Sequence, residues 1–366
     1  MRLELIQINN FRNLEQVTIR PAAGINLLVG KNAQGKTNFL EALYVLAHGT
    51  SFRTVRDSDL VCDQKDTYEI KVVYQKEGRL VQSTLHYAST KGKVLRINNK
   101  RSTFSHPDRL RMVLFTPDDL YIVKGSPHLR RSFLDLILCQ VSNEYAQYLN
   151  NYSKILKKRN LFLKTKHVNQ EVEFLTRDML IENAVPLIMG RINLVEWLEK
   201  EIHSLYRKIT GGNSKIKLRY ALSFTINKDR ASRESVSAAL RQALDEKQES
   251  EMRRGTTLVG PHRDDLNIYI DDRNARTHAS QGEQRSLAVV LKAAEMTTIK
   301  NIRGIAPIFL LDEVMAELDQ TRRTLLLEHL SSSDSQSFLT TVERDVIVTK
   351  QAGVFNVTNG KLFEEA

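Results

Sequence analysis

The residues best suited to chemistry form a glycine-rich loop near the N-terminus. The run Gly30-Lys31-Asn32-Ala33-Gln34-Gly35-Lys36-Thr37 matches the phosphate-binding pattern G-x-x-x-x-G-K-[ST] at every fixed position. Its glycines let main-chain N–H groups converge on phosphate oxygens, and a following helix would add its positive end. Lys36 would supply charge to the β and γ phosphates, and Thr37 a hydroxyl to Mg²⁺. The loop therefore predicts binding of ATP with Mg²⁺; a chance glycine-rich turn is the alternative.

An acidic pair should complete this site. The apolar run Pro307–Leu311 ends in Asp312 and Glu313. Asp312 would hold Mg²⁺ through its water shell, and Glu313 would orient and deprotonate the attacking water. The alternative is a strand that ends in two solvated acids. A kinase needs no such water-activating base, so we expect an ATPase with Lys36, Asp312 and Glu313 as its catalytic residues.

A third motif lies between the loop and the acidic pair. Ser280-Gln281-Gly282-Glu283-Gln284 precedes a helical stretch and resembles the signature of the ABC-type ATPases. In that superfamily the signature of one protomer faces the γ-phosphate held by the other, and the helix N-terminus contributes to this anion site. Glu317, Leu318 and Asp319 resemble the D-loop, which lies along the dimer interface of such proteins.

Strands and a helix must position these motifs. Alternating apolar residues predict strands at Leu3–Ile8 and Val17–Ile19, and the buried run Ile25–Val29 leads into the phosphate loop. A helix should follow, because apolar residues recur at helical spacing from Leu40 to Ala47. Further strands are predicted at Tyr68–Gln75, Arg79–Tyr87, Val94–Ile97 and Arg111–Thr116.

The middle of the chain is predicted to be mainly helical. Helical periodicity dominates after Pro127, Ile216–Phe224 is typical of a strand, and Ser232–Met252 of a helix with Ser232 as its N-cap. Near the end, Asn359-Gly360 between two apolar runs predicts a β-hairpin. We therefore expect a discontinuous α/β ATPase lobe of residues 1–116 and 256–366, with a mainly helical insertion of residues 117–255.

Composition narrows the class of protein. No apolar run approaches the roughly 18 residues of a transmembrane helix. The only cysteines, Cys62 and Cys139, exclude a disulfide framework or a Cys-rich zinc site and fit a reducing cytoplasm. Lys and Arg number 54 against 43 Asp and Glu, a net charge of +11. That charge favours a polyanionic partner, such as nucleic acid or an anionic membrane surface.

Basic residues gather in the predicted insertion. Six of them, and no acid, lie between Tyr145 and Gln170: Lys154, Lys157, Lys158, Arg159, Lys164 and Lys166. Such a cluster can neutralise DNA phosphates and release counterions. Nothing here resembles a base-reading motif, so recognition should be of the backbone and of DNA shape. A solvated helix face is the alternative for each residue. We expect DNA to contact Lys154, Lys157, Lys158 and Arg159.

Together these motifs resemble the RecF family of bacterial DNA-repair ATPases, which is related to SMC head domains but lacks their long coiled coil. The resemblance runs the length of the chain: Ile8–Leu14, the phosphate loop, Ser51–Arg53, Phe115–Leu120, Val123–Pro127, Arg130–Asp135, Leu258–Asp265 and the signature. The phosphate loop alone places the chain only among nucleotide-hydrolysing proteins. The KGSP, RR-x-FLD and GPHRDD stretches make the resemblance specific.

The resemblance implies an α/β ABC-type ATPase head, a mixed sheet with an antiparallel part, that carries a helical second lobe. It implies an ATP-dependent homodimer that binds gapped or single-strand/double-strand DNA and hydrolyses ATP slowly. It also implies RecO- and RecR-like partners that help to load the recombinase RecA. Arg12 and Asn13 match positions that approach the bound nucleotide in such heads.

Two departures from related ATPases remain. Phe115–Asp119 occupies the place of the Q-loop without a Gln, and Thr340, Thr341 and Val342 stand where transporter ATPases have a switch His. His262 in GPHRDD fits either a structural turn or a catalytic role. The alternative functions are the ATPase subunit of an ABC transporter, which would need a membrane partner, and another SMC-like DNA-processing ATPase.

Overall fold

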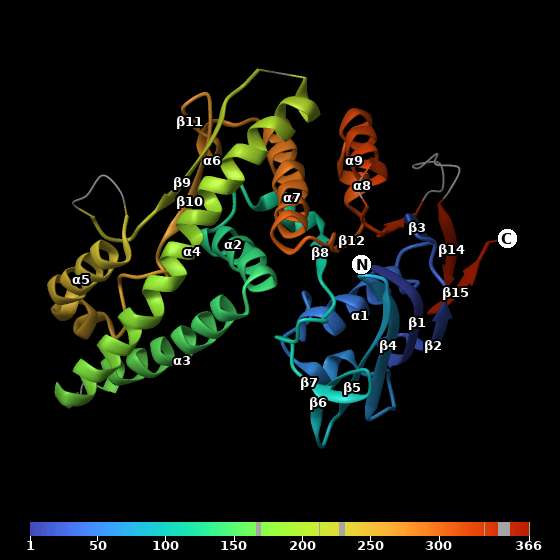
Figure 1. Cartoon of the computed structure of the whole chain (residues 1–366), viewed down its shortest axis with the longest axis horizontal. Helices are drawn as coiled ribbons and strands as arrows, with labels where there is room; N and C mark the ends of the chain where they lie inside the picture. The colour runs from blue at the N-terminus through green and yellow to red at the C-terminus, as the bar shows by residue number, and fades with distance from the viewer. Residues whose placement is uncertain (166–169, 212, 227–230, 333, 343–351, 366) are drawn as a thin grey trace. The chain divides into compact units, whose positions relative to one another are not determined.

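The computed structural model describes residues 1–165, 170–211, 213–226, 231–332, 334–342 and 352–365. The chain divides into two compact units: unit 1 comprises Met1–Leu120 and Glu295–Ala366, and unit 2 comprises Tyr121–Ala294. In Figure 1, unit 1 contains the blue and red ends of the chain, and unit 2 the green and yellow middle. The helix α7 (Gln281–Arg303) contains the second boundary.

The first sheet of unit 1 is antiparallel, and β1 with β4 is the pair of neighbouring strands that is not consecutive in the chain. Among the described residues it has six strands, in the order β2-β1-β4-β5-β6-β7. Buried and less buried residues alternate along β4, and along β1 apart from interruptions at Glu4-Leu5 and Asn9-Asn10, as expected for strands with one face on the core. The strands are β1 (Arg2–Phe11), β2 (Leu14–Ile19), β4 (Thr67–Lys76), β5 (Arg79–Ala88), β6 (Gly92–Ile97) and β7 (Lys100–Ser102).

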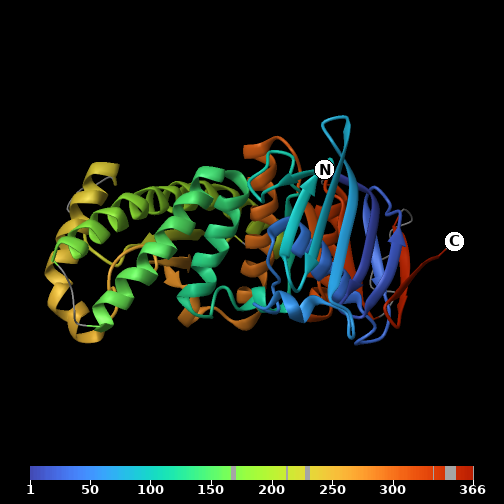
Figure 2. The ribbon, with the colours of Figure 1, turned by 90° about the horizontal axis from the view of Figure 1, so that it is seen from below.

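The second sheet of unit 1 carries the predicted site. Its described strands have the order β15-β14-β3-β13-β12-β8, and all pairs except β14 with β15 are parallel. The strands are β3 (Ile25–Val29), β8 (Met112–Phe115), β12 (Ile308–Leu311), β13 (Ser337–Thr341), β14 (Gly353–Thr358) and β15 (Lys361–Glu364). Figure 2 gives a second view of these strands. Because β3 and β12 run in the same direction, the phosphate loop and Asp312 follow them at one edge of the sheet.

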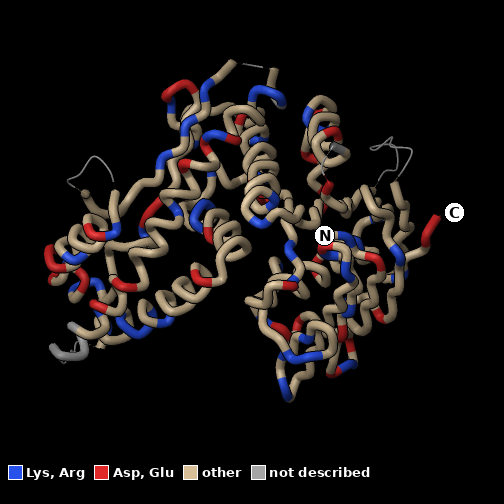
Figure 3. Tube along the Cα trace, viewed as in Figure 1, with Lys and Arg blue, Asp and Glu red and all other residues tan. Residues whose placement is uncertain are grey.

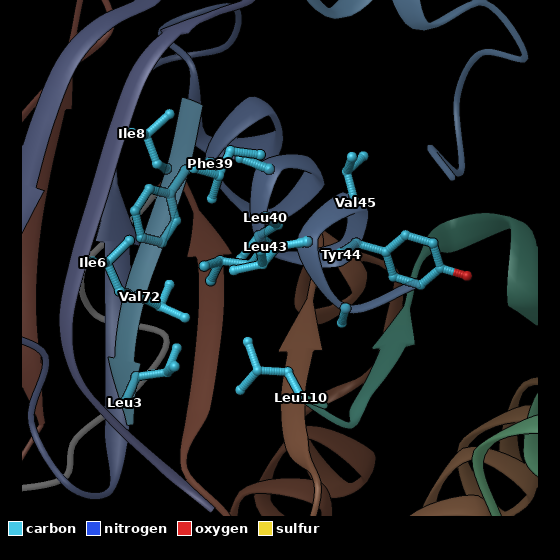
Figure 4. Packing of buried hydrophobic residues seen from close by; sticks show 14 of the residues in the cluster. Leu3, Ile6, Ile8, Phe39, Leu40, Leu43, Tyr44, Val45, Val72 and Leu110 are labelled. Carbon is cyan, nitrogen blue, oxygen red and sulfur yellow. The ribbon is translucent and has the colours of Figure 1, made fainter. Parts of the chain in front are cut away.

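Helix α1 (Lys36–His48) lies between the two sheets. It contacts β1, β4 and β5 of the first sheet and β8 and β13 of the second. Phe39, Leu40 and Leu43 are fully buried, beside Ile6 of β1 and Leu110 (Figure 4). Burying each such side chain contributes about 1.5–3 kcal/mol. This core therefore fixes α1 and, with it, the loop that precedes it.

Short helices complete unit 1. They are the 3-10 helices η1 (Asp57–Leu60) and η2 (Pro117–Tyr121), whose last residue belongs to unit 2, and the α-helices α8 (Val314–Glu317) and α9 (Gln320–Ser332). The predicted C-terminal hairpin is confirmed, because Thr358 of β14 pairs with Lys361 of β15. Its turn residues Asn359 and Gly360 have φ of 48° and 74°, typical of a two-residue hairpin turn.

Unit 2 combines helices with a small sheet. The helices are α2 (Pro127–Val141), α3 (Asn143–Thr165), α4 (Gln170–Thr210), α5 (Arg233–Arg254), α6 (Ala275–His278) and the first part of α7. The described strands have the order β11-β10-β9, and they are β9 (Ile216–Ala221), β10 (Asp265–Ile270) and β11 (Arg273–Asn274). The predicted N-cap of α5 is confirmed, since Ser232 Oγ accepts from the Ser235 N–H at 3.1 Å. Within the described ranges no helix is long and apolar enough to cross a membrane.

The end of unit 2 differs from the expected boundary at residue 256. The structure extends unit 2 to Ala294. The reason is the antiparallel pairing of β10 with β9, which runs from Asp265 opposite Ala221 to Ile270 opposite Ile216. A strand pairing between distant segments has no signal in the sequence at the boundary itself, so the end of the helical stretch near Gly255 does not coincide with the end of unit 2.

Candidate nucleotide-binding site

The phosphate loop leaves β3 and enters α1 with both of its fixed glycines tightly packed. Gly35 has φ of +113°, and a Cβ there would lie 2.9 Å from Asn13 Oδ1. A Cβ on Gly30 would lie 2.4 Å from the carbonyl oxygen of Val357. Glycine is required at both positions because no side chain fits. Lys31, Asn32 and Ala33 are exposed between them, and Gln34 is half-buried.

Lys36 lies across the inside of this loop. Its Nζ donates to the carbonyl oxygens of Gly30 at 2.7 Å and Lys31 at 3.0 Å, and Glu313 Oε1 is 3.6 Å away. The residue is only 3% exposed. Both acceptors of its hydrogen bonds are neutral carbonyls, and its contact with a bound phosphate stays a prediction.

Thr37 and Asp312 meet at the carboxyl edge of the sheet. Thr37 Oγ1 donates to Asp312 Oδ1 at 2.9 Å, and Thr340 Oγ1 donates to the same oxygen at 2.9 Å. Burial raises the pKa of Asp312, while these two hydrogen bonds act in the opposite direction. A hydroxyl and a carboxylate are the hard oxygen ligands that Mg²⁺ prefers. The pair expected to hold the metal is therefore assembled and fits it.

Glu313 follows Asp312 in an unusual backbone conformation. Its φ is +54°, and its N–H donates to Thr340 Oγ1 at 2.8 Å. The Glu313 side chain is 43% exposed and reaches toward Lys36. Thr340 thus contacts both acidic residues, a role that sequence reasoning missed. The only signal in the sequence is a threonine at the end of an apolar strand, at the place where transporter ATPases have a switch His.

Arg12 is held by a buried carboxylate. Its Nε and Nη2 donate to Glu41 at 3.1 and 2.9 Å, and Glu41 is fully buried. Ser51 Oγ at 2.5 Å and Arg53 Nη1 at 3.3 Å contact the same carboxylate. Two family-typical segments and α1 therefore converge on Glu41. Contact of Arg12 with the nucleotide stays a prediction.

Asn13 lies beside the loop itself. Its Oδ1 accepts from Asn38 Nδ2 at 2.8 Å and stands against Gly35. The structure thus brings together Asn13, Gly35, Lys36, Thr37, Asp312, Glu313 and Thr340, all in unit 1. Whether Asn13 touches nucleotide also stays a prediction.

The signature residues begin α7 in unit 2. Ser280 Oγ accepts from the Glu283 N–H at 3.2 Å, and Glu283 Oε2 accepts from the Ser280 N–H at 2.7 Å. This reciprocal capping box starts the helix at Gln281 and Gly282. Gln284 Nε2 donates to the Ala279 carbonyl at 2.8 Å. The motif is therefore a helix N-terminus, as an anion site requires; its use across a dimer stays a prediction.

The residues that resemble the D-loop join α8 to α9. Glu317 is exposed, Leu318 is buried, and Asp319 Oδ1 caps α9 by accepting from the Arg322 N–H at 3.0 Å. These contacts explain the local structure of Glu317–Asp319. An interface role stays a prediction.

The basic cluster on α3 divides into two kinds of residue. Lys154, Lys157 and Lys158 are exposed, in the part of α3 that Figure 3 marks with Lys and Arg. Arg159 is only 3% exposed: it donates to Glu251 at 2.7 Å and to Thr257 Oγ1 at 2.8 Å. The expected DNA contact of Arg159 is therefore wrong, because its charge is neutralised inside unit 2. Lys166 lies outside the described residues.

The family-typical RR-x-FLD and GPHRDD stretches form one polar network in unit 2. Arg130 Nε and Nη2 donate to the two carboxylate oxygens of Asp265 at 2.8 and 2.9 Å. Arg131 Nη1 donates to the Asp264 carbonyl at 2.7 Å. Arg191 pairs with Asp135 at 2.8 Å through both oxygens. These ion pairs tie α2 to β10 and α4, so the motifs hold unit 2 together.

His262 belongs to the same network. Its Nδ1 is 2.6 Å from Tyr152 Oη and its Nε2 is 3.1 Å from the Thr257 carbonyl. Burial lowers the pKa of His262 to about 4, so the ring is neutral at pH 7. A neutral ring accepts from Tyr152 at Nδ1 and donates from Nε2 to the carbonyl. Both ring nitrogens are occupied, which favours the structural role.

Comparison with known proteins gives a consistent result. A family model for the RecF/RecN/SMC N-terminal domain matches residues 2–362. The chain is 40% identical over 375 residues to the DNA replication and repair protein RecF of an Exiguobacterium species, covering 100% of both chains. It is 35% identical to the RecF protein of Bacillus subtilis, covering 99% of this chain and 100% of that one.

Solved structures agree with these relatives. The recombination mediator protein RecF with ATPrS, of the RecFOR pathway, matches with a TM-score of 0.91 at 28% identity, over 100% of this chain and 98% of that one. An Smc head bound to the C-winged helix domain of ScpA matches with a TM-score of 0.57 at 17% identity, over 100% of this chain and 98% of that one. The expected ABC-type α/β fold is confirmed.

Proposed function

The chain belongs to the RecF family of DNA replication and repair proteins, and on that premise we propose that it is an ATP-driven DNA-binding dimer with slow, DNA-dependent ATP hydrolysis. The observation that carries the proposal is the meeting of Lys36, Thr37, Asp312 and Glu313 at the loop edge of one sheet. Two segments separated by 275 positions in the sequence supply the parts of one phosphate site.

Binding would begin at the loop. Lys36 Nζ would exchange the carbonyls of Gly30 and Lys31 for oxygens of the β and γ phosphates, and main-chain N–H groups would bind the rest. Thr37 and Asp312 would hold Mg²⁺, which would neutralise the charge that develops on the phosphates. Thr340 would keep Asp312 in place through the 2.9 Å hydrogen bond.

Hydrolysis would depend on Glu313. Its carboxylate lies 3.6 Å from Lys36 Nζ, beside the position that the γ-phosphate would take. There it would orient a water molecule and accept its proton. The hydrogen bond from the Glu313 N–H to Thr340 holds the backbone of this base.

DNA would bind unit 2 through exposed lysines. Lys154, Lys157 and Lys158 line a cavity of about 870 Å³ together with Leu149, Leu156 and Leu187. Exposed lysines suit phosphates, and apolar side chains in the lining suit unpaired bases. This combination supports a preference for gapped or single-strand/double-strand DNA over plain duplex. DNA repair of this kind takes place in the cytoplasm, so we expect the protein to act there.

ATP would join two protomers. The helix N-terminus at Ser280–Gln284 of one protomer would cap the γ-phosphate held at Gly30–Thr37 of the other, with Glu317–Asp319 along the interface. ADP lacks the γ-phosphate and would favour the dimer less. RecR- and RecO-like proteins are the proposed partners, and loading of a RecA-type recombinase the proposed outcome, as the RecFOR pathway named for the matching structure suggests.

Sedimentation of Ser280→Arg with ATP and gapped DNA tests this proposal. The variant should bind ATP like the wild type but remain a monomer and lose ATP-dependent DNA retention, because its side chain would occupy the partner's phosphate site. Ser232→Arg is the matched control, since it also removes an N-cap serine of a unit 2 helix. Lys36→Ala should not bind ATP. A wild-type amount of dimer in Ser280→Arg would refute the composite site.

A further inference from the structure

The turn that closes the C-terminal hairpin lies against the phosphate loop. The Asn359 N–H donates to Gln34 Oε1 at 2.7 Å. The Gly360 N–H donates to the Gln34 carbonyl oxygen at 2.9 Å. The main-chain N–H groups of Asn359 and Gly360 thus bind the side-chain and main-chain oxygens of Gln34 in the phosphate loop.

The same turn is packed so closely that only glycine fits at position 360. Gly360 is buried, and an added Cβ would lie 1.9 Å from the carbonyl oxygen of Asn13. Asn13 in turn stands against Gly35, where a Cβ would lie 2.9 Å from its Oδ1. The hairpin turn, Asn13 and the phosphate loop are therefore in close contact with one another, without space for a side chain at Gly360 or Gly35.

The hydrogen bond to the Gln34 carbonyl also orients the next peptide group. A trans peptide is planar, so its C=O and N–H point in opposite directions. With the Gln34 oxygen held toward the hairpin turn, the Gly35 N–H points away from that turn. Nothing in the described part of the chain accepts a hydrogen bond from this N–H, although Gly35 is buried. A buried main-chain donor in a phosphate loop needs an acceptor that a ligand can supply.

We propose that Asn359 and Gly360 are positioning residues of the nucleotide site, which hold Gln34 so that the Gly35 N–H is aimed at a phosphate of ATP or ADP. The inference rests on the proposed binding of ATP at this loop. Asp312 and Glu313 are held by Thr37 and Thr340 instead. The hairpin turn therefore sets nucleotide affinity and leaves the chemical step unchanged.

Gly360→Ala is the direct test, and the molecule offers a matched control. Glu77-Gly78, between β4 and β5, forms the same kind of turn with φ of 50° and 79°, and a Cβ on Gly78 meets nothing within 4 Å. Gly360→Ala should weaken binding of ATP and ADP alike by about 10- to 100-fold, the range for hydrogen bonds to charged groups. The kcat at saturating ATP should stay within about twofold. Gly78→Ala should bind like the wild type.

Two further variants separate main-chain from side-chain roles. Gln34→Met removes only the acceptor of the Asn359 N–H and should weaken nucleotide binding by about 2- to 10-fold. Asn359→Gly keeps that N–H and tolerates φ of 48°, so it should bind like the wild type. Hydrogen exchange of the wild type should slow at residues 353–364 when ATP binds, and not at residues 67–88.

Each outcome decides the question. If Gly360→Ala folds and binds ATP as tightly as Gly78→Ala, the inference is refuted. If Gly360→Ala does not fold, two other results together refute the inference. Gln34→Met would bind ATP with normal affinity, and hydrogen exchange at residues 353–364 would not change when ATP binds. A rise in KM with unchanged kcat supports it, whereas a fall in kcat alone contradicts it. If the wild type itself binds no ATP, the proposed function fails and this inference fails with it.

Discussion

The phosphate loop of unit 1 and the basic helix α3 of unit 2 each contain a cation that is 3% exposed, and the two cations have different partners. Lys36 donates to neutral carbonyls, with its nearest carboxylate oxygen at 3.6 Å. Arg159 donates directly to the buried Glu251 at 2.7 Å. We propose that Lys36, whose hydrogen bonds go to neutral carbonyls, binds an anionic ligand, whereas Arg159 is hydrogen-bonded to a carboxylate inside the protein. The hydrogen-bond partner, and not the degree of burial, distinguishes Lys36, the proposed binding residue, from Arg159, a structural one.

The same comparison applies to neighbours on one helix. Lys158 and Arg159 are adjacent in sequence, but Lys158 is exposed and Arg159 faces α5 and Thr257. Successive helical residues lie about 100° apart around the axis. Adjacent charges in a helical sequence therefore lie on different faces, and here only Lys158 of the two meets solvent.

The largest expected effect concerns the acid beside Lys36. Glu313→Gln should slow ATP hydrolysis by roughly 10²- to 10⁴-fold, the usual contribution of a general base, while ATP still binds. Steady-state hydrolysis and nucleotide affinity measure the two properties separately. Glu328→Gln, an exposed acid on α9, is the control and should hydrolyse ATP normally. Normal turnover in Glu313→Gln would show that another group activates the water.

The next effect concerns the stability of unit 2. Arg159→Ala should lower the free energy of unfolding by about 3–5 kcal/mol, because Glu251 is left charged and buried. Lys158→Ala should change it by less than about 0.5 kcal/mol. Urea unfolding of both variants is the measurement, and Arg159→Met with Glu251→Met should recover part of the loss. Equal stability of Arg159→Ala and Lys158→Ala would contradict the distinction drawn between them.

The smallest effect concerns DNA. Replacing Lys157 and Lys158 by Ala should weaken binding about equally for all sequences and reduce the slope of log K against log salt by up to about 0.9 per lost phosphate contact. ATP hydrolysis without DNA should not change. The control replaces Lys91 and Lys100, two exposed lysines of unit 1, and should keep the wild-type slope. An unchanged slope in the Lys157 and Lys158 variant would place the DNA elsewhere.

The sequence by itself determined the features whose parts are neighbours along the chain. Ile25–Val29 became β3 with the predicted bounds, and Ser232 caps α5 as its side chain requires. Asn359-Gly360 forms a hairpin turn because glycine and asparagine accept positive φ. The phosphate loop belongs to the same group, since its glycines, its lysine and the start of α1 lie within one short segment.

Only the tertiary structure decided which distant groups meet. Thr37 contacts Asp312, which is 275 positions away in the sequence, and Arg159 contacts Glu251, which is 92 positions away. Thr340, on a neighbouring strand, contacts both Asp312 and Glu313. The pairing of β10 with β9 likewise set the end of unit 2. Hydrophobic periodicity and turn residues indicate the local backbone conformation, but they do not indicate which strand or helix packs against which. That choice depends on how the side chains of the whole core pack together, and it determined which of the predicted site residues lie close to one another.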